Sequence, residues 1–360
     1  MLVVDEVGNR RETWRDAFGR VIETDEPDSS GNLTVGTCYT YDGNNNLLTV
    51  TSLGLTQTQK PTYTYDYLSR VTSKTLPESG PTNFYYTTSG GALCSGNPSA
   101  VCRRADGRGI TTTYTYDALN RSTGKTYSDS THAVSYSYDQ TSYNGLTITN
   151  GKGRRTGMSD GSGQTAWSFD TIGYVLTEER TINGQTKTVN YTDYLDGTVA
   201  AITYPGGRTV TYTEGNAQRM TQAVDSTNNI NYAMAPASPT VMYAPQGSPQ
   251  NLIFGKTGTF NGISEIRSYN NRLEITGIEA TSSAATPLNL SYSYVSGNNG
   301  NIGQQTNNAT SGRTQNYTYD SLNRLLTAQT QAASGGDCWG QSQGHPVGGR
   351  ERLSTAQSSV

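Results

Sequence analysis

The chain has 360 residues, of which only 32% are hydrophobic and 15% charged, while glycine (40) and tyrosine (25) are abundant. Disordered chains are poor in aromatic residues and rich in charge, and tyrosine, threonine, valine and isoleucine favour strands, so the composition predicts an all-β protein with many turns. The net charge of −3 gives no electrostatic reason to expect nucleic acid or an anionic membrane as a partner, and no apolar run is long enough to span a bilayer.

The N-terminal segment contains two acidic residues, each followed three positions later by glycine. Asp5 precedes Gly8 in VDEVGNRR, and Asp16 precedes Gly19 in RDAFGRVI. The same segment lacks the basic stretch and apolar run of a signal peptide. We therefore expect either that export uses information outside this chain or that the chain is a fragment of a longer protein.

A repeated motif follows this segment. Its four clear copies are YTYDGNNNLL at 39–48, YTYDYLSRVT at 63–72, YTYDALNRST at 114–123 and YTYDSLNRLL at 317–326, and its weaker copies are YSYDQTSYNG at 136–145 and WSFDTIGYVL at 167–176. Two aromatic residues at alternate positions lie on one face of a strand. Asp accepts hydrogen bonds from backbone amides in a turn, and Gly or Asn three positions later tolerates a positive φ. Each copy thus predicts a β-hairpin.

Two cysteines, Cys94 and Cys102, bracket a short loop between the second and third clear copies. In an oxidising compartment they could close a local disulfide, and in a reducing one they would remain two unpaired thiols. Spacing alone does not decide between these alternatives. A zinc site is not expected, because no second close pair of Cys or His residues exists.

The rest of the chain carries degenerate copies and no strong catalytic motif. Residues 191–222 read as two degenerate hairpins, and 266–278 and 292–305 continue the pattern. The segment QNLIFGKTG at 250–258 lacks the first glycine of a phosphate-binding loop, so we expect Lys256 and Thr257 to lie in an exposed turn. The only histidines, His132 and His345, form no recognisable catalytic arrangement.

The repeat pattern ends near residue 330. We therefore expect two regions, a repeat array at 1–330 and an unpatterned tail at 331–360. The tail is read as disordered, truncated, or shifted in reading frame at the end of a gene fragment.

The recurring YxYDxxxR motif resembles the YD repeat of the RHS family, which includes bacterial RHS and wall-associated proteins, shell components of insecticidal toxin complexes, and teneurins. The resemblance implies tandem hairpins in a long, twisted and curved antiparallel sheet that forms part of an open shell around a toxin or other cargo. Relatives that form shells are longer and carry a DPxGL-like self-cleaving element, whereas this chain has no DP dipeptide.

The motif residues have a structural and a functional interpretation. A glycosidase needs one special pair of carboxylates, so a periodic series favours turn formation by Asp16, Asp42, Asp66, Asp117, Asp170 and Asp320, with Gly19, Asn120 and Asn323 at the positive-φ position. Packing between hairpins, with Arg–aromatic contacts, is favoured over sugar stacking for Tyr63, Tyr65, Tyr114, Tyr116, Tyr317, Tyr319, Arg70, Arg121 and Arg324. The segment DSSGN at 28–32 lacks the spacing of a calcium loop and is not counted as a site.

These observations predict a structural, encapsulating scaffold of an RHS-like secreted or cell-surface protein. We expect no catalytic residue, metal or cofactor, no nucleic-acid partner, and an encapsulated cargo or a carbohydrate as partner. One alternative is a carbohydrate-binding adhesion module. The other is the shell part of a polymorphic toxin whose C-terminal toxin domain is absent from this chain.

Overall fold

The computed structural model describes residues 1–360 except 29, 54–59, 216, 237–241, 310–312 and 332–360. Its described residues form strands, turns and connections without helix. One antiparallel sheet contains 27 strands, and β13 and β14 form a separate pair. The expected class, an all-β array of tandem hairpins in one long antiparallel sheet, is confirmed.

The strands are short, and their bounds in the first half of the chain are β1 (Leu2–Val4), β2 (Arg10–Arg15), β3 (Val21–Pro27), β4 (Leu33–Tyr41), β5 (Leu47–Ser52), β6 (Thr62–Tyr65), β7 (Val71–Leu76), β8 (Gly80–Tyr85), β9 (Arg103–Ala105), β10 (Thr111–Tyr116), β11 (Ser122–Tyr127), β12 (Val134–Tyr138), β13 (Ser142–Tyr143), β14 (Leu146–Thr147), β15 (Arg155–Asp160) and β16 (Gly163–Phe169). Those in the second half are β17 (Val175–Ile182), β18 (Gln185–Asp193), β19 (Val199–Thr203), β20 (Thr209–Glu214), β21 (Met220–Asp225), β22 (Ile230–Met234), β23 (Asn251–Thr257), β24 (Ile263–Tyr269), β25 (Ile275–Thr281), β26 (Leu288–Tyr294), β27 (Ile302–Asn307), β28 (Arg313–Tyr319) and β29 (Leu325–Gln331).

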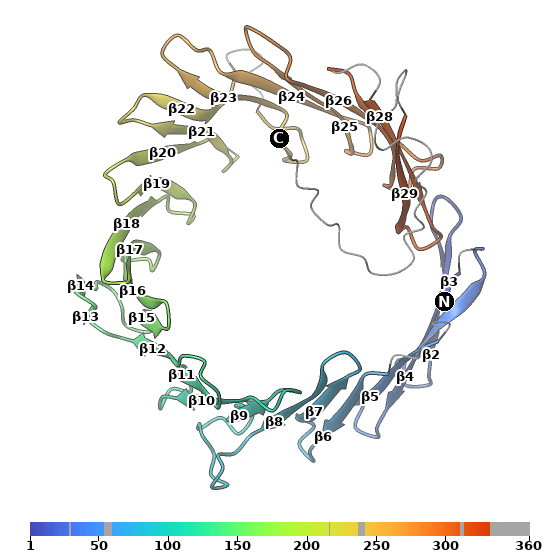
Figure 1. The fold of residues 1–360 in the computed structure, drawn as a ribbon, viewed down its shortest axis with the longest axis vertical. Helices are drawn as coiled ribbons and strands as arrows, with labels where there is room; N and C mark the ends of the chain where they lie inside the picture. Colours follow the sequence, from blue (N-terminus) through green and yellow to red (C-terminus); the bar gives the residue numbers. More distant parts are fainter. Residues whose placement is uncertain (29, 54–59, 216, 237–241, 310–312, 332–360) are drawn as a thin grey trace. The chain divides into compact units, whose positions relative to one another are not determined.

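Pairing in the sheet follows the order of the chain. In the described ladders each strand pairs with the next one, as β6, β7 and β8 do (Figure 1). The exception is β12, which pairs with β15 across the β13–β14 hairpin. Successive connections therefore alternate between the two edges of the sheet, because neighbouring strands run in opposite directions.

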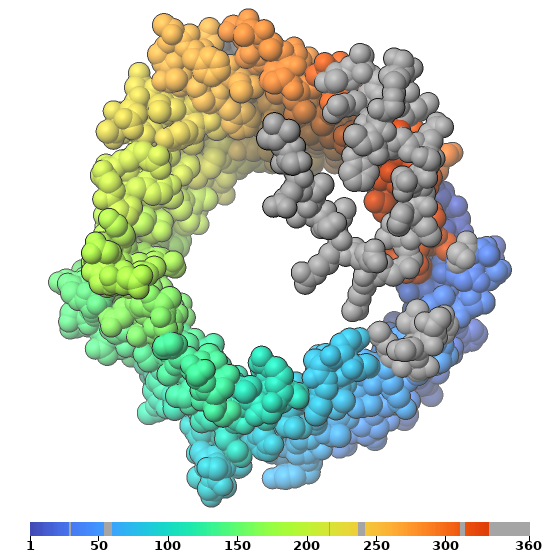
Figure 2. Space-filling view, viewed as in Figure 1, coloured from blue at the N-terminus to red at the C-terminus, as the bar shows by residue number. Residues whose placement is uncertain are grey.

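The chain divides into two compact units. Unit 1 comprises Met1–Gly36 and Ile230–Val360, and unit 2 comprises Thr37–Asn229. Within unit 2, the colours of the space-filling view follow the sequence from blue through green to yellow, so each hairpin lies beside the next one (Figure 2). The predicted tail at 331–360 lies outside the described residues apart from residue 331, the last of β29, so the boundary expected near residue 330 stays a prediction.

Most of the five-residue turns of the array share one geometry, which we call the closing turn. In the turn at 66–70, the amide of Asp66 donates to the carbonyl of Arg70, and the amide of Ser69 donates back to the carbonyl of Asp66. Ser69 has a φ of 59°. A type I turn followed by one left-handed residue is a common three-residue hairpin loop, and we number its positions 1 to 5 from Asp66 to Arg70.

The two faces of a hairpin differ in character. Tyr63 and Tyr65 of β6 lie half-buried on one face, while Thr64 between them is exposed on the other. The Thr64 hydroxyl lies 2.8 Å from that of Thr72 on the paired strand. The register slips by one residue between Thr64 and Tyr65, and such bulges increase the local twist of a sheet.

One group of buried apolar residues lies in unit 2. The connection at 139–154, which includes β13 and β14, covers β15 and β16, so that Ile148, Ala166 and Phe169 are buried. The Thr149 hydroxyl donates to the carbonyl of Phe169 at 2.6 Å. Met242, Ala244 and Leu252 form part of the buried apolar set in unit 1, and the described residues contain few buried apolar side chains for their number, so a single layer of hydrogen-bonded hairpins accounts for most of the array.

The expected turn at Lys256 and Thr257 is wrong. Both residues belong to β23, where they pair with Asn231 and Ile230 of β22. The turn follows at once, closed by reciprocal backbone hydrogen bonds between Thr257 and Phe260. The strand-forming residues before Gly258 continue the pairing with β22 as far as Thr257. This pairing has a stronger effect on the backbone than the turn preference of the glycine that follows. The described residues contain no helix that is long and apolar enough to span a membrane.

Candidate functional site

The most repeated polar arrangement is the carboxylate at position 1 of the closing turns. One oxygen, Oδ1, accepts hydrogen bonds from the amides of positions 3 and 5, at 2.8 to 3.0 Å. The residues that do so are Asp16, Asp42, Asp66, Asp117, Asp170 and Asp320. These two bonds satisfy amides that the turn leaves without backbone partners, so the carboxylate holds the turn together.

The second carboxylate oxygen binds the side chain at position 5. Arg20, Arg70, Arg121 and Arg324 each donate Nε–H to Oδ2 of their own turn, at 2.6 to 2.7 Å. In the turn at 42–46 the Asn46 amide takes the same place at 2.8 Å. The turn at 170–174 has tyrosine at position 5. Both oxygens are therefore engaged in most copies, and the acid–base capacity of the carboxylate is low.

Position 4 has a left-handed backbone in the aligned turns. Gly19 has a φ of 80°, Asn120 of 63° and Asn323 of 61°. Gly tolerates this region without a steric penalty, and Asn is enriched there. The sequence therefore places at position 4 the residue types that this backbone conformation favours.

In several hairpins a tyrosine close before the turn links the hairpin to the preceding one. The Tyr65 hydroxyl donates to the carbonyl of Leu47, at 2.9 Å, and the Tyr116 hydroxyl to that of Val101, at 2.8 Å. Tyr319 does the same to Ile302 at 2.9 Å. We call these residues clamp tyrosines, and Tyr86, Tyr138, Tyr269 and Tyr294 make equivalent bonds.

The arginine at position 5 completes the link from the other side. Arg70 lies over the ring of Tyr86, with its Cζ atom 4.2 Å from the centroid, and Arg121 lies over Tyr138 at 4.3 Å. Each of these contacts is worth about 0.5–1 kcal/mol at a partly exposed position. The carboxylate of one turn thus binds its own arginine, and the arginine lies over the clamp tyrosine of the next hairpin. The hydroxyl of that tyrosine donates back to a carbonyl of the first hairpin.

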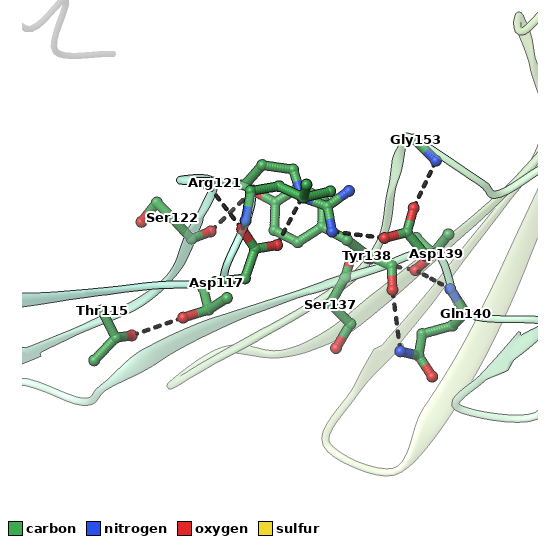
Figure 3. Close-up of polar contacts among 12 residues, drawn as sticks. Thr115, Asp117, Arg121, Ser122, Ser137, Tyr138, Asp139, Gln140 and Gly153 are labelled. Atoms are coloured by element: carbon green, nitrogen blue, oxygen red, sulfur yellow. Dashed lines mark hydrogen bonds and ion pairs between the residues drawn. The ribbon is translucent and has the colours of Figure 1, made fainter. Parts of the chain in front are cut away.

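Figure 3 shows the most elaborate of these junctions. Arg121 lies between Asp117 and Asp139, donating to the first at 2.7 Å and to the second at 2.6 Å, above the ring of Tyr138. The amide of Gly153 also donates to Asp139. This places the connection at 139–154 against the neighbouring turn.

The pKa directions agree with a structural role for these charges. Hydrogen bonding from Arg70 holds the pKa of Asp66 below its ordinary value, and the backbone amide of Arg121 does the same for the pKa of Asp117. Burial raises the pKa of Tyr65, Tyr116 and Tyr319. The ordinary charge states, anionic Asp and neutral Tyr, are therefore the ones that the junction stabilises.

The remaining residues proposed for sugar stacking lie near the same junctions. Tyr63 and Tyr114 are half-buried on their strands, and the hydroxyl of Tyr317 donates to the side chain of Gln315 at 2.6 Å. Arg324 is 72% exposed and binds Asp320. Together with the clamp tyrosines, these residues use much of their polar capacity within the array.

Cys94 and Cys102 are joined by a disulfide. The loop that it closes contacts turns on both sides. The Asn120 Oδ1 atom accepts from the Ser95 hydroxyl at 2.6 Å, and the carbonyl of Pro98 accepts from Arg70. The remaining cysteines are Cys38 in β4 and Cys338, which lies outside the described residues.

Sequence reasoning missed several closing turns. Asp28 and Asp106 make the same backbone and carboxylate bonds, although no tyrosine pair precedes them. The segment at 28–32 had been considered only as a cation loop. The turn at 270–274 lies in the segment 266–278 that is predicted to continue the pattern, and there Asn270 replaces Asp and Leu273 takes position 4 with a φ of 66°. Asp followed three residues later by Gly is the signal that would have found the turns at 28–32 and 106–110.

Other chemistry finds little support in the described part of the chain. No group of three or more His, Cys, Asp or Glu residues there could hold a metal ion. His132 lies in the connection between β11 and β12, and His345 falls outside the described residues. The arrangement is suited to joining hairpins.

Comparison with known proteins identifies the fold. No protein-family model matches the sequence, and no curated protein matches it. The structure is similar to the crystal structure of TcdB2-TccC3-Cdc42, with a TM-score of 0.58, 14% identity and coverage of 90% of this chain. It is also similar to TcdB2-TccC3 without its hypervariable C-terminal region (0.60, 14%, 90%) and to the Photorhabdus luminescens Tc holotoxin pore (0.59, 14%, 89%).

The similarity shows that this chain has the fold of part of those proteins. The chain spans about a fifth of their length, 20%, 19% and 19% respectively. One of these structures is described as a Tc holotoxin pore, and its fold is shared over 89% of this chain. The expected resemblance to toxin-complex shell proteins is therefore confirmed at the level of the fold.

Proposed function

We propose that this chain is a non-catalytic wall segment of a shell that encloses a cargo, in an RHS-like secreted or cell-surface protein. The observation that carries the proposal is the repeated junction, in which carboxylate, arginine and clamp tyrosine join consecutive hairpins. Each carboxylate holds its own turn, and none is singled out as an active-site pair. In this proposal residues 1–330 form the wall.

The similar structures support the proposal of a cargo. One is described as lacking a hypervariable C-terminal region and another as a holotoxin pore. A wall that shares this fold would serve to enclose a separately folded or unfolded polypeptide. Encapsulation needs a continuous hydrogen-bonded surface, and lateral links between hairpins are what such a surface requires.

One experiment separates the scaffold from an enzyme. Asp66→Ala, Asp117→Ala and Asp320→Ala are compared with the wild type in chemical denaturation and in a screen for glycan hydrolysis. We expect each variant to lower the denaturation midpoint to a similar extent, because each carboxylate has an equivalent environment, and we expect no hydrolysis. Midpoints are the suitable measure, because a repeat array need not unfold in two states.

Asp129→Ala is the matched control. Asp129 is also a loop carboxylate, but it does not close a five-residue turn: it accepts from the amide of Thr131, at 3.1 Å, and bonds with the side chain of the same residue. Its replacement should shift the midpoint less than the three repeat variants do. Hydrolysis by the wild type that disappears in a single variant would overturn the scaffold proposal.

The space for a cargo is tested by solution scattering. A compact chain of this length has a radius of gyration of about 21 Å. A single-layer wall that borders an open space should give a clearly larger value. A measured radius near the compact value would count against encapsulation and leave the conclusion about catalysis untouched.

A further inference from the structure

Unit 1 contains a contact between turns that are far apart in the sequence. Asn323, in the turn at 320–324, accepts a hydrogen bond from the Asn9 side chain at 3.3 Å, and the Ser321 hydroxyl donates to the carbonyl of Asp28. Arg272, one closing turn further along that edge, binds Glu6 at 3.1 Å. Turns of one sheet edge thus lie against turns of another.

The two edges in this contact belong to different classes. The turns at 270–274 and 320–324 follow clamp tyrosines, Tyr269 and Tyr319, and we call the edge that carries such turns the clamped rim. The turns at 5–9, 16–20 and 28–32 connect β1 to β4 in succession. Because connections alternate between the two edges of the sheet, the turns at 5–9 and 28–32 lie on the edge opposite to that of the turn at 16–20. We call an edge of this second kind the opposite rim. The contact in unit 1 therefore joins a clamped rim to an opposite rim.

Docking changes the exposure of the clamped rim. Leu322, at position 3 of the docked turn, is half-buried, and the side chain of Asp320 is only 7% exposed. The equivalent residues of other turns are much more exposed, with values of 81% for Phe18, 53% for Leu68, 69% for Leu119 and 53% for Ile172. Leu322, which lies where the two rims meet, is thus less exposed than its apolar counterparts at position 3 of the other clamped turns.

The clamped rim of unit 2 presents these apolar residues in a series. Leu68, Leu119 and Ile172 occupy the same position of three closing turns on this edge, and each is more than half exposed. Polar residues also occupy position 3, as Ser30, Asn44 and Arg108 show. Because the apolar type recurs at one turn position on one edge, these side chains offer a repeated point of contact.

A hollow lies beside the middle of this row. It has a volume of about 640 Å³, and its lining includes Leu119, Ile148 and Lys152. The docked contact in unit 1 has a smaller hollow of about 280 Å³, lined by Val7 of the opposite rim together with Tyr319 and Asn323 of the clamped rim. Both hollows lie on a clamped rim, and in unit 1 an apolar side chain from position 3 of an opposite-rim turn reaches it.

We propose that the clamped rim of unit 2 binds the opposite rim of a second copy of this chain. The opposite rim of unit 2 carries the turn at 106–110, which has the same Asp-x-x-Gly bonding as the turns at 5–9 and 28–32. A second copy therefore offers the kind of surface that already contacts a clamped rim in unit 1. This surface concerns self-association and goes beyond enclosure of a cargo.

The symmetry of the contact determines the form of the assembly. A clamped rim joined to an opposite rim is a head-to-tail contact, which leaves one free rim of each kind on every pair. Association should therefore continue beyond the dimer. The average mass should rise with concentration without a plateau at two copies.

Sedimentation of the full chain over a wide concentration range tests this proposal. The triple variant Leu68→Asn, Leu119→Asn and Ile172→Asn removes the apolar row with a residue that position 3 accommodates in this chain, at Asn44. We expect the wild type to associate in the open-ended manner and the triple variant to remain monomeric at the same concentrations. Circular dichroism and the denaturation midpoint verify that the variant is folded.

Ile266→Thr is the control, because Ile266 is 45% exposed on β24 and lies away from any rim. It should associate as the wild type does. A monomeric wild type, a closed dimer, or association that survives the triple substitution would each overturn the proposal. The last outcome would indicate pairing through unpaired sheet edges. The hydrolysis screen has no bearing on this result, so failure here leaves the proposed function intact.

Discussion

Position 4 of the closing turn makes the strictest demand on a single residue. Its left-handed backbone costs roughly 1–2 kcal/mol for an ordinary L-residue, and only Gly, and to a lesser degree Asn or Asp, avoids most of that cost. Gly8, Gly19, Asn45, Asn120, Gly173 and Asn323 meet this demand. Leu273, with a φ of 66°, does not, and its turn therefore stores conformational strain.

Leu273→Asn and Leu273→Gly should stabilise the protein by about 1 kcal/mol, because they relieve this strain. Leu273→Ala should have little effect, since alanine removes the exposed apolar side chain without relieving the backbone. Urea denaturation of the three variants measures the difference. Equal effects of Asn and Ala would show that the apolar side chain, and not the backbone, is responsible.

At this scale the sequence predicts the turns well, because their chemistry is local. Asp at position 1 and Gly or Asn at position 4 are three residues apart, and both act on the backbone between them. Copies such as the turn at 106–110 escape detection because the aromatic pair, which made the motif visible, does not contribute to the turn itself. The apolar residues at position 3 can be read from the sequence. The lower exposure of Leu322 cannot, because it accompanies a contact with residues that are distant in the sequence.

Hairpins are joined to one another by clamp tyrosines. Tyr116→Phe removes the hydroxyl that donates to the carbonyl of Val101 and keeps the ring that packs on the sheet. It should lower stability by about 1 kcal/mol, the usual net value of one such bond. The matched control is Tyr114→Phe on the same face of β10. A loss of the same size in both variants would show that the clamp has no special role.

The disulfide loop makes the second link between hairpins. Replacing both Cys94 and Cys102 by alanine, or reducing the wild type, should cost about 2–3 kcal/mol in the chain-entropy model for a loop this short. The free loop should also become sensitive to proteases. Denaturation with and without reductant, together with alkylation and mass spectrometry, tests this. Unchanged midpoints and complete alkylation without reductant would contradict it.

The partners of these links were harder to predict than the turns. The spacing between copies varies, so the sequence does not show which tyrosine lies beside which arginine. The ladder register decides it, and it places Arg121 over Tyr138 and against Asp139. The weak copy at 136–145 predicts a hairpin closed directly after Asp139, and this is wrong, because β12 pairs with β15 beyond the connection at 139–154.

The whole array should respond to acid as one series of similar groups. The pKa of Asp66, Asp117 and their counterparts is lowered in the folded state, so folding favours their anionic form. Their contribution is complete above the unfolded pKa, about 3.9, and is lost as the pH falls through the lower folded pKa. Urea midpoints should thus stay level down to about pH 4–5 and then fall steeply. Asp117→Asn should reduce the slope.

The alkaline limit has the opposite sign. The pKa of Tyr65, Tyr116 and Tyr319 is raised by burial, so the neutral hydroxyl is favoured in the folded state. This contribution is complete below the unfolded pKa of about 10 and declines as the pH rises through the folded value. A midpoint that does not change above pH 10 would argue against the clamp tyrosines as a source of stability.

The local closure of every hairpin also bears on how the protein folds. Strand partners within a hairpin are close in the sequence, as Tyr65 and Val71 are, and low sequence separation between contacting residues favours fast folding. Hairpins can therefore form one after another as the chain leaves the ribosome, each adding to the edge of the last. The contact between Asn9 and Asn323 must wait until residue 323 has been made, and it therefore forms later than the hairpins that lie between them.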